Sequence, residues 1–521
     1  MHDDWWRGAA IYELYVQSFA DAGNDGMGDL AGARARLPYL ADLGVDAIWF
    51  TPWYPSPLAD AGYDVADYRD IAPRFGTLAE ADALISEAHG HGIKIIIDLV
   101  PNHCSDRHAW FQAALKAQPG TPERARFWFR DRPNNWQSRF GGLAWTQVGD
   151  GDWYLHIFAP EQPDFNWSNA EVRAEFEDIL RFWFDRGVDG IRIDTAGMLT
   201  KEPGLPDLDD EHPHPFVDRD DVHDIYRRWR QIADEYGARV LIGEIWLADT
   251  ARLARYTRPD ELHTVFNFPY LSCPWDAARL RAVIDDTLAL PAAPTWVLAN
   301  HDVDREVSRY GRADTSFDLD ARDHSQEVDL ELGTRRARAA ALLTMALPGA
   351  VYIYQGEELG LWEVEDIPED RRQDPIFHRT GGADPGRDGC RVPLPWSGTE
   401  PPFGFSAGHE PWLPQPKQWR ELTVQAQSGD PASMLTLYRT ALRVRRQQLS
   451  VAGVLTWLDA PAGVLAFDRA DGLRCVANLS DTPVELPAAA EIVLASGPLA
   501  SDARLPPDST VWLRLSPQTL A

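Results

Sequence analysis

The sequence predicts an α/β fold: a (β/α)8 TIM barrel with an inserted domain after its third strand and an antiparallel β-sandwich at the C-terminal end. Short apolar runs alternate with stretches of helical spacing over the first 100 residues. The alternation stops between residues 102 and 169, resumes, and from about residue 451 changes to short β-type runs separated by turn residues. Continuous apolar runs are typical of parallel strands that helices cover on both faces.

The elements follow in order. The barrel strands are predicted at residues 11–19, 47–50, 93–99, 190–193, 240–242, 264–268, 295–299 and 351–354. The helices with the clearest spacing are predicted at residues 30–43, 77–91, 171–185 and 222–236. The C-terminal strands are predicted at residues 454–458, 464–468, 473–478, 491–495 and 510–515. About eight barrel strands match a (β/α)8 barrel, whose active site lies at the carboxyl ends of the strands.

These patterns divide the chain into three domains. The barrel is assigned to residues 1–101 and 170–450, the inserted domain to 102–169 and the C-terminal domain to 451–521. Residues 361–416 are dense in Pro, Gly and Asp, and a connection of this length is usually functional or a small subdomain.

The chain of 521 residues carries a formal net charge of −30. This charge argues against nucleic acid and anionic membranes as partners and favours a neutral substrate. The sequence has neither an apolar run of about 18 residues nor a signal-peptide pattern, so no membrane partner is expected. Four widely spaced cysteines, without metal spacing, indicate reduced thiols. We expect a cytoplasmic protein, a monomer or small homo-oligomer.

Polar side chains end four of the predicted strands, at residues 98–103, 190–194, 243–246 and 300–302. They include the carboxylates of Asp194, Glu244 and Asp302. Cleavage of a glycosidic bond with retention requires two carboxyl groups about 5–5.5 Å apart, one as nucleophile and one as acid. This set therefore predicts a glycoside-cleaving site, although each carboxylate alone would suit a structural ion pair or a surface position equally well.

Two neighbours suit the roles of these carboxylates. Arg192 lies two residues before Asp194, on the same face of the strand, and would keep that carboxylate ionised as a nucleophile requires. Trp246 offers Glu244 an apolar wall, a setting that favours a general acid.

These segments resemble the four conserved regions of the α-amylase superfamily of glycoside hydrolases, family 13. Residues 162–166 (Gln-Pro-Asp-Phe-Asn) and 356–360 (Gly-Glu-Glu-Leu-Gly) are similar to sequences of its α-glucosidase and oligo-1,6-glucosidase group. The resemblance covers essentially the whole chain and implies a retaining exo-α-glucosidase. It implies that Asp194 is the nucleophile, Glu244 the general acid and base, and Asp302 a stabiliser of the transition state.

The resemblance also implies the residues of a closed glucose pocket. The residues expected around the cleaved glucose are His103, Arg192 and His301, with Tyr63 stacked under the sugar ring. The residues expected to wall the entrance, from the inserted domain, are Phe140, Phe158 and Gln162. An ion pair between Asp60 and Arg391 is expected to close the far end, which makes the enzyme exo-acting rather than endo-acting.

The residue after the nucleophile carries information on linkage. Members of the group that prefer α-1,6 bonds tend to have Val there, and those that prefer α-1,4 bonds tend to have Thr or Ala. Thr195 therefore implies a maltose-like oligosaccharide substrate. An α-glucosyltransferase or disaccharide isomerase would use the same intermediate, and the sequence leaves these alternatives open, since the outcome depends on how well the site excludes water. A non-catalytic partner protein on the same barrel is disfavoured, because all three carboxylates are present.

A divalent-cation loop of the resembling proteins, D-x-N-x-D-G-x-G-D, has a changed counterpart here. The matching oxygen donors are Asp21, Asp25, Asp29 and the Met27 carbonyl, while Gly23 replaces the Asn. Enough hard oxygen remains for Ca²⁺ or Mg²⁺. A structural cation is expected in this loop, and no cofactor is expected for catalysis.

Overall fold

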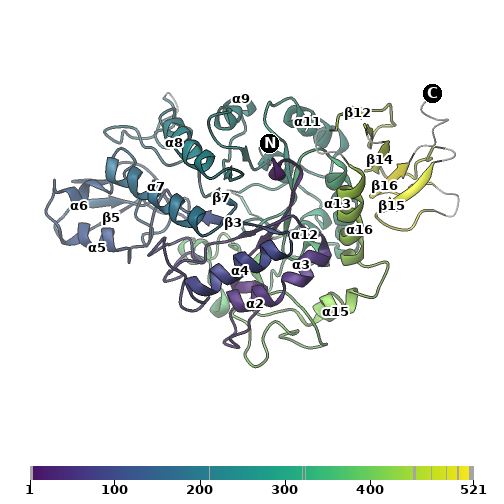
Figure 1. Ribbon diagram of the computed structural model, residues 1–521, viewed down its shortest axis with the longest axis horizontal. Helices are drawn as coiled ribbons and strands as arrows, with labels where there is room; N and C mark the ends of the chain where they lie inside the picture. Colours follow the sequence, from purple (N-terminus) through teal and green to yellow (C-terminus); the bar gives the residue numbers. More distant parts are fainter. Residues whose placement is uncertain are drawn as a thin grey trace.

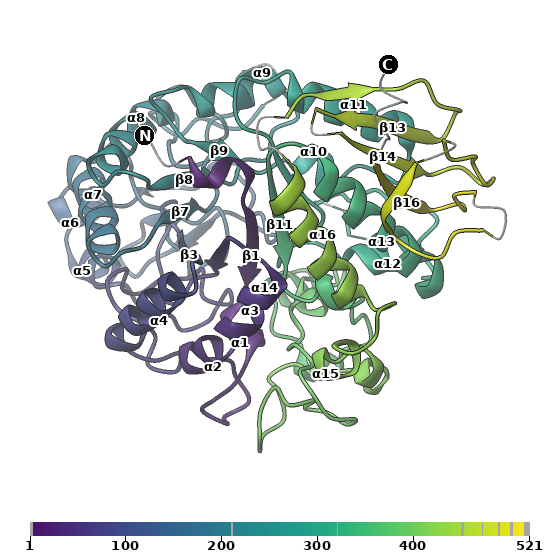
Figure 2. The same ribbon diagram turned by 45° about the vertical axis from the view of Figure 1, so that its right-hand side comes forward.

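The computed structural model describes residues 4–209, 212–319, 321–322, 324–449, 453–470, 472–487, 490–500 and 504–514. Eight parallel strands form one curved sheet in the order β10-β11-β1-β2-β3-β7-β8-β9. They are β1 (Ala10–Leu14), β2 (Ala47–Phe50), β3 (Lys94–Leu99), β7 (Gly190–Ile193), β8 (Val240–Gly243), β9 (Thr264–Val265), β10 (Thr295–Val297) and β11 (Ala350–Tyr354). Figure 2 shows them at the centre of a ring of helices, so the predicted barrel is confirmed.

The two edge strands, β9 and β10, meet through threonine side chains. The Thr295 hydroxyl donates to the Val265 carbonyl oxygen at 2.6 Å, and the Thr264 hydroxyl donates to the Ala293 carbonyl oxygen at 3.3 Å. A hydroxyl can supply the donor that a backbone ladder would otherwise provide. These side-chain hydrogen bonds close the barrel.

Helices cover the outside of the barrel (Figure 1). The longer helices are α4 (Leu78–Gly90), α7 (Ala170–Asp185), α8 (Val222–Glu235), α11 (Ala277–Leu288), α13 (Leu330–Ala346) and α16 (Met434–Gln448). The shorter ones are α1 (Val16–Phe19), α2 (Leu30–Ala35), α3 (Leu37–Leu43), α9 (Thr250–Leu253), α10 (Phe268–Leu271), α12 (Glu306–Gly311), α14 (Pro375–Arg379) and α15 (Val424–Gln427). With helices outside and side chains inside, the barrel strands are buried along almost their whole length.

Two predicted elements are divided in the structure. The strand predicted at residues 11–19 ends at Leu14, and the residues after it form α1. The helix predicted at residues 30–43 is two helices, α2 and α3, which meet at Arg36. Pro38 lies in the first turn of α3, where its missing N–H is harmless, but its ring cannot continue a helix from the preceding turn.

The inserted segment after β3 forms a separate lobe at the left of Figure 1. It contains α5 (Ala109–Lys116), α6 (Pro122–Ala125), β4 (Phe129–Arg130), β5 (Trp145–Gln147) and β6 (Trp153–Leu155), with the strands in the order β4-β6-β5. Its own apolar core includes Trp136 and Trp145, and it also takes in Phe216 from the barrel's β7–α8 connection. The lobe is therefore packed on the carboxyl ends of the central strands, beside the expected active site.

The C-terminal strands form one antiparallel sheet in the order β12-β13-β14-β16-β15. They are β12 (Leu455–Trp457), β13 (Val464–Arg469), β14 (Leu473–Asn478), β15 (Glu491–Ala495) and β16 (Ser509–Arg514). One face joins the main core through Phe467 and Trp512, and the Trp512 indole N–H donates to the Leu342 carbonyl oxygen of α13.

The opposite face of this sheet has no second sheet over it among the described residues. It is covered by a connection that forms one isolated bridge, Val484 with Leu505. The predicted C-terminal antiparallel domain is confirmed, but as a single sheet, because the barrel helices α13 and α11 take the place of a second layer.

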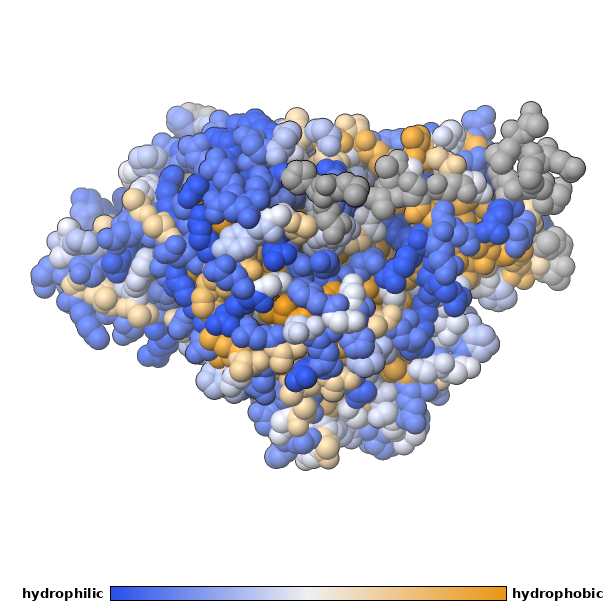
Figure 3. Space-filling model, in the orientation of Figure 1, coloured by the Kyte–Doolittle hydropathy of each residue, from blue (hydrophilic) through white to orange (hydrophobic). Residues whose placement is uncertain are grey.

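The face in Figure 3 is largely hydrophilic, as the acidic composition predicts, and hydrophobic residues gather beside the C-terminal sheet at the right. In the part of the chain that the structure describes, no helix combines the length and the apolar character needed to cross a bilayer.

Candidate active site

The carboxyl ends of β3, β7 and β8 bring three carboxylates onto one guanidinium. Arg192 donates from Nη1 to Asp98 Oδ1 at 2.9 Å and to Asp194 Oδ1 at 2.8 Å, and its Nη2 lies 2.8 Å from Glu244 Oε2. All four side chains are buried. Because the guanidinium presents its donors in a planar fork, it directs the carboxylates of Asp194 and Glu244 toward one region. The expected nucleophile and the expected acid therefore lie together.

Asp194 is one of three carboxylates that share the positive charge of Arg192. Burial raises the pKa of the Asp194 carboxyl well above its ordinary value; Arg192 opposes this rise, and the charges of Glu244 and Asp98 add to it. Burial likewise raises the pKa of Asp98 to about 6. The ion pair expected between Arg192 and Asp194 exists, but one positive charge is divided among three carboxylates. The hydrogen bond and charge of Arg192 are therefore what favour the ionised form of Asp194 that a nucleophile requires.

Glu244 is oriented by the residues that follow and precede it. A Cβ on Gly243 would lie 2.6 Å from Leu262 Cδ1, so glycine permits the close approach of these segments. Trp246 donates from its indole N–H to Glu244 Oε1 at 3.0 Å and stacks on Phe268 with ring centroids 3.6 Å apart. The expected apolar wall thus also supplies a hydrogen bond that fixes the acid.

Thr195, directly after the expected nucleophile, has an unusual backbone conformation. Its φ is 44°, in the left-handed region that a β-branched residue rarely adopts. In this conformation its backbone N–H donates to Glu244 Oε2 at 2.8 Å. Its hydroxyl is buried and has no hydrogen-bond partner among the described residues. The strained turn therefore links the nucleophile and the acid through the backbone.

Asp302 follows β10 and contacts two arginines and one histidine. Arg391 Nη2 and Arg387 Nη1 lie 2.8 Å and 3.1 Å from its Oδ1, and His301 Nε2 lies 3.3 Å from its Oδ2. Burial alone would raise the pKa of Asp302, but the charges of Arg387 and Arg391 hold it well below its ordinary value. Burial lowers the pKa of His301 well below its ordinary value, so its imidazole is a neutral neighbour of Asp302. Asp302 is therefore ionised at neutral pH, which suits a group that stabilises a positively charged transition state.

The prediction of an ion pair between Asp60 and Arg391 is wrong. Asp60 Oδ1 accepts from Arg387 Nη2 at 2.6 Å, whereas Arg391 donates to Asp302. Both arginines lie in the short segment 386–391 and both contact Asp302, but of the two only Arg387 pairs with Asp60. No local spacing distinguishes them, so sequence reasoning selected the wrong one and missed Arg387.

Tyr63 has the expected position beside the catalytic carboxylates. Its ring stacks on the imidazole of His301, with centroids 5.2 Å apart and planes 6° from parallel. Its hydroxyl donates to Asp98 Oδ2 at 2.8 Å. The stacked imidazole of His301 and the hydrogen bond of the Tyr63 hydroxyl therefore fix the orientation of the Tyr63 ring, as stacking under a sugar requires.

Gln162 lies deeper than expected, next to His103, which lines the cavity as expected. Burial lowers the pKa of His103 to about 4, so its imidazole is neutral at working pH. Gln162 is fully buried and donates from its Nε2 to Asp60 Oδ2 at 3.0 Å. The expectation that Gln162 walls the entrance is therefore wrong: it supports the inner end of the pocket instead.

A cavity of about 920 Å³ is lined by most of the predicted site residues. This volume lies within the range of sites for small molecules. The expected residues that line it are Asp60, Tyr63, His103, Phe140, Phe158, Asp194, Glu244 and Asp302. The expected residues that instead lie behind its lining are Gln162, Arg192, His301 and Arg391. The two aromatic residues of the inserted domain, Phe140 and Phe158, contact one another with centroids 5.4 Å apart.

A buried ammonium ties the inserted domain to the barrel. Lys201 Nζ lies 2.8 Å from Asp164 Oδ2 and donates to Asn102 Oδ1 at 2.6 Å and to the Met198 carbonyl oxygen at 2.7 Å. These partners belong to the inserted domain, the end of β3 and the segment after β7. Nothing in the sequence pattern distinguishes Lys201, because its three partners come together only in the folded chain.

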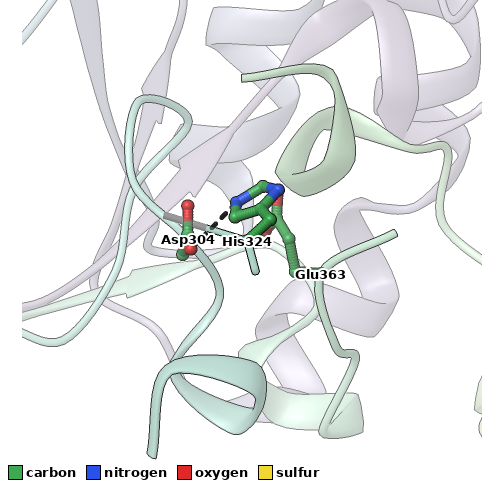
Figure 4. A group of neighbouring side chains, drawn as sticks. All are labelled: Asp304, His324 and Glu363. Atoms are coloured by element: carbon green, nitrogen blue, oxygen red, sulfur yellow. Dashed lines mark hydrogen bonds and ion pairs between the residues drawn. The ribbon is translucent and has the colours of Figure 1, made fainter. Parts of the chain in front are cut away.

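The connection between α12 and α13 forms one wall of the cavity and is held at its base by ion pairs. His324 Nε2 and Arg312 Nη1 lie 3.1 Å and 2.5 Å from Asp304 Oδ2. Figure 4 shows Glu363 close to His324 on the side away from Asp304. This group has ligand atoms within metal-binding distance of one another, but Arg312 already supplies a positive charge to Asp304.

The expected cation loop is folded around its own backbone. Asp29 Oδ2 accepts from the backbone N–H of Gly23 at 2.7 Å, and Asp25 Oδ1 accepts from that of Met27 at 3.0 Å. Asp21 also accepts two backbone N–H groups. Within the described ranges, the ligand atoms of the three carboxylates do not come within 4.8 Å of one another. As folded, these residues do not fit a cation cage, and the cation remains a prediction.

Comparisons with known proteins agree with this architecture. Residues 13–453 match the family described as the catalytic domain of alpha amylase, and residues 453–512 match a domain of unknown function. A probable alpha-glucosidase of Rhizobium meliloti is 38% identical over 92% of this chain and 90% of its own length. An oligo-1,6-glucosidase of Parageobacillus thermoglucosidasius is 34% identical over 85% of this chain and 84% of its own length.

Solved structures agree as well. The crystal structure of an alpha-glucosyl transfer enzyme has a TM-score of 0.87 and 35% identity, and covers 98% of this chain and 99% of that one. A trehalulose synthase has a TM-score of 0.85 and 30% identity, with 98% and 100% coverage. From its barrel, its inserted domain, its three strand-end carboxylates and these matches, the chain belongs to the alpha-amylase family of glycoside hydrolases.

Proposed function

We propose that the protein is a retaining exo-α-glucosidase that releases glucose from the non-reducing end of short α-glucosides. One observation carries the proposal: Arg192 holds Asp194 and Glu244 together beside a cavity in which Asp60 and Arg387 form an ion pair. A pocket closed by such a pair accepts the end of a sugar chain and leaves no path for the chain to continue.

The reaction has two displacements. In the first, the Asp194 carboxylate attacks the anomeric carbon while Glu244 donates a proton to the leaving oxygen. In the second, water attacks the β-glucosyl ester, Glu244 takes the proton from that water, and the Asp194 carboxylate leaves. The ionised Asp302 faces the developing positive charge. The neutral His103 can bind sugar hydroxyls without adding charge.

A preference for α-1,4 bonds is supported by Thr195, a residue of the cavity lining whose buried hydroxyl has no partner in the described structure. Rotation of the side chain about its Cα–Cβ bond would turn this hydroxyl toward a hydroxyl of the leaving sugar. A cytoplasmic location is supported by the four cysteines, all buried as free thiols. A monomer or small homo-oligomer is proposed with it, and light scattering on the eluted protein would measure the state.

Glucosyl transfer is the second candidate, because similar structures belong to a glucosyl transfer enzyme and a trehalulose synthase. Transfer or isomerisation begins from the same glucosyl ester and differs only in what attacks it. The products at high substrate concentration separate these outcomes from hydrolysis.

The test is a substrate panel of maltose, isomaltose, maltoheptaose and starch, with products separated by chromatography and Asp194→Asn as the control. We expect glucose as the first product, released as the α-anomer, and loss of activity in the control variant. Initial release of β-glucose, or of internal fragments from starch, would contradict the proposal.

A further inference from the structure

A second cavity, of about 200 Å³, lies at the opposite end of the barrel from the catalytic carboxylates. Its walls come from residues before β1 and β2, the last turns of α16 and the end of β13. Figure 1 shows α16 and the C-terminal sheet on the same side of the barrel. Because the cavity adjoins the amino ends of the parallel strands and the catalytic groups follow their carboxyl ends, the two sites are separate.

Positive charge predominates in the lining of this cavity, although the whole chain has a formal net charge of −30. Arg445, Arg446 and Arg469 contribute three guanidinium groups, and Asp46 is the one carboxylate among the described lining residues. Asp46 Oδ1 accepts from Arg446 Nη2 at 2.7 Å, and its Oδ2 accepts from the backbone N–H of Ala10 at 2.8 Å. Both oxygens of this carboxylate are therefore already bound.

Arg445 has hydrogen-bond donors that its neighbours do not use. The residue is only 8% exposed. Its Nη1 donates to the carbonyl oxygens of Met345 and Leu347 at 2.6 Å and 2.8 Å, and its Nη2 donates to that of Gly349. These bonds occupy three of the five N–H groups of a guanidinium. Nε has no partner among the described residues, so one edge of the buried guanidinium is available to a ligand.

The carbonyl contacts explain why Arg445 is buried at this place. A cation is favoured at the carboxyl end of a helix, and Met345 and Leu347 lie at the end of α13. Arg469 is also buried and donates from Nη1 to the Ala346 carbonyl oxygen at 2.5 Å. This capping role uses one side of the Arg445 guanidinium and leaves its Nε edge without a function.

The charge of Arg445 has no carboxylate within ion-pair distance in the ranges that the structure describes. Burial and the charge of Arg469 lower the pKa of Arg445 to about 10, and the charge of Asp46 opposes this change. At neutral pH the side chain is therefore still a cation. A buried charge without a counter-charge is costly, and an anion in the cavity would remove part of this cost through charge-assisted hydrogen bonds.

The donor geometry indicates the class of anion. A guanidinium presents its N–H groups in a planar fork that matches the oxygens of phosphate. The small volume of the cavity favours a small ligand. We propose that this cavity binds a small oxyanion of the phosphate class, either inorganic phosphate or the phosphate group of a small monoester.

Such an anion would join two domains. It would contact the barrel domain through Arg445 and Arg446 of α16, and the C-terminal sheet through Arg469 of β13. The inference does not depend on the proposed glucosidase activity, since none of these residues lies at the active site.

Isothermal titration calorimetry on the full chain measures the binding directly. The protein is dialysed against HEPES and sodium chloride, and inorganic phosphate and ethyl phosphate are titrated separately at constant ionic strength. We expect saturable binding of one anion per chain. Tighter binding of phosphate would identify the free anion as the ligand, and tighter binding of ethyl phosphate would identify a monoester; either result supports the proposal.

Two variants with opposite changes of charge test the cavity itself. Arg446→Gln removes a positive charge and Asp46→Asn removes the negative one, at side chains that are 54% and 39% exposed. We expect the Kd for phosphate to rise about three- to tenfold in the first variant and to fall about three- to tenfold in the second. Both variants lose the same ion pair, so a purely structural effect would change Kd in the same direction in both. Arg443→Gln, at an exposed arginine of α16, is the control for net charge and should leave Kd unchanged.

Arg445→Lys tests the buried donors. Lysine keeps the charge but cannot form the planar fork, so we expect the Kd for phosphate to rise about tenfold. The Arg446 and Asp46 variants decide the question even if this buried variant does not fold.

The absence of saturable phosphate binding to the wild-type protein would overturn the proposal. So would equal Kd values in the Arg446 variant, the Asp46 variant and the Arg443 control. Hydrolysis of 4-nitrophenyl α-glucoside by the same samples tests the proposed function separately, and we expect it to be unchanged in the Arg446 and Asp46 variants.

Discussion

The backbone N–H of Thr195 donates to the carboxylate of Glu244 across 2.8 Å, so the residue after the nucleophile also holds the acid. The positive φ of Thr195 turns its amide in this direction. Chemistry on the two carboxylates is thus coupled through one short turn, and side-chain changes at Thr195 can alter specificity while the backbone hydrogen bond stays in place.

Thr195→Val tests the linkage preference. Valine keeps the shape of threonine and the backbone N–H, but it removes the hydroxyl that has no partner within the described structure. We expect the ratio of kcat/KM for maltose to that for isomaltose to fall by about tenfold, as loss of one hydrogen bond predicts. Thr195→Ser retains the hydroxyl and is the control. An unchanged ratio in the valine variant would remove Thr195 from the linkage argument.

Arg387→Lys tests which arginine closes the pocket. Arg387 contacts Asp60, Asp302 and Asp374, and a lysine cannot reproduce this three-way contact. We expect kcat/KM for maltose to fall by about 10²-fold, the cost of a small misplacement in an active site. Arg371 forms an ion pair with Glu410 at the surface of segment 361–416, and Arg371→Lys should have no effect on kcat/KM. Full maltose activity in the Arg387 variant would contradict this account of the pocket.

Lys201→Met tests the link between the inserted domain and the barrel. The variant leaves the buried carboxylate of Asp164 without its cation, which costs roughly 3–5 kcal/mol in comparable buried pairs. We expect the free energy of unfolding in urea to fall by about that amount. The double variant with Asp164→Asn should recover part of the loss, since no buried charge then remains unpaired. Equal stability of the single and double variants would count against the ion pair.

The pH dependence of stability should reflect His324 and Glu363. Burial alone would lower the pKa of His324, but the hydrogen bond and the charge of Asp304, with the charge of Glu365, raise it above its ordinary value. Its contribution to stability is therefore complete below pH ~6.5 and is lost as pH rises through the folded value. Burial raises the pKa of Glu363 from 4.5 to about 8, so its contribution to stability is complete below about pH 4.5 and is lost as pH rises to about 8.

We therefore expect Tm to decrease as pH rises from about 6.5 to about 8.5. His324→Gln removes the histidine contribution and should flatten this decrease, and Glu363→Gln should flatten it further. His91→Gln, at an exposed histidine, is the control. A decrease of equal steepness in the wild type and in both variants would assign the effect to other groups.

The loop of Asp21, Asp25 and Asp29 leads to opposite predictions from sequence and structure. Its carboxylates already accept backbone N–H groups, so we expect Tm to be the same in EDTA and in millimolar Ca²⁺ or Mg²⁺. A higher Tm with either cation would support the cation that the family resemblance implies. Asp25→Asn, which removes the exposed carboxylate, should then abolish the increase.

The pattern of apolar runs with polar residues at their ends was sufficient to predict the barrel and the order of its catalytic residues. Continuous apolar runs can be buried only as parallel strands under helices, and polar residues at the ends of such strands meet at one edge because all the strands point the same way. The proximity of Asp194, Glu244 and Asp302 thus follows from strand direction and strand order.

Sequence alone determined that Asp194, Glu244 and Asp302 meet at the active site, because burial and strand direction act on every segment in the same way. Only the tertiary structure decided that Asp60 binds Arg387 rather than Arg391, that Gln162 lies beneath the pocket and that Lys201 joins three segments. Each of these contacts depends on the direction in which a side chain leaves its own segment and on the neighbour it then meets. No periodicity along the chain records that direction, since the partners are brought together by packing between distant parts.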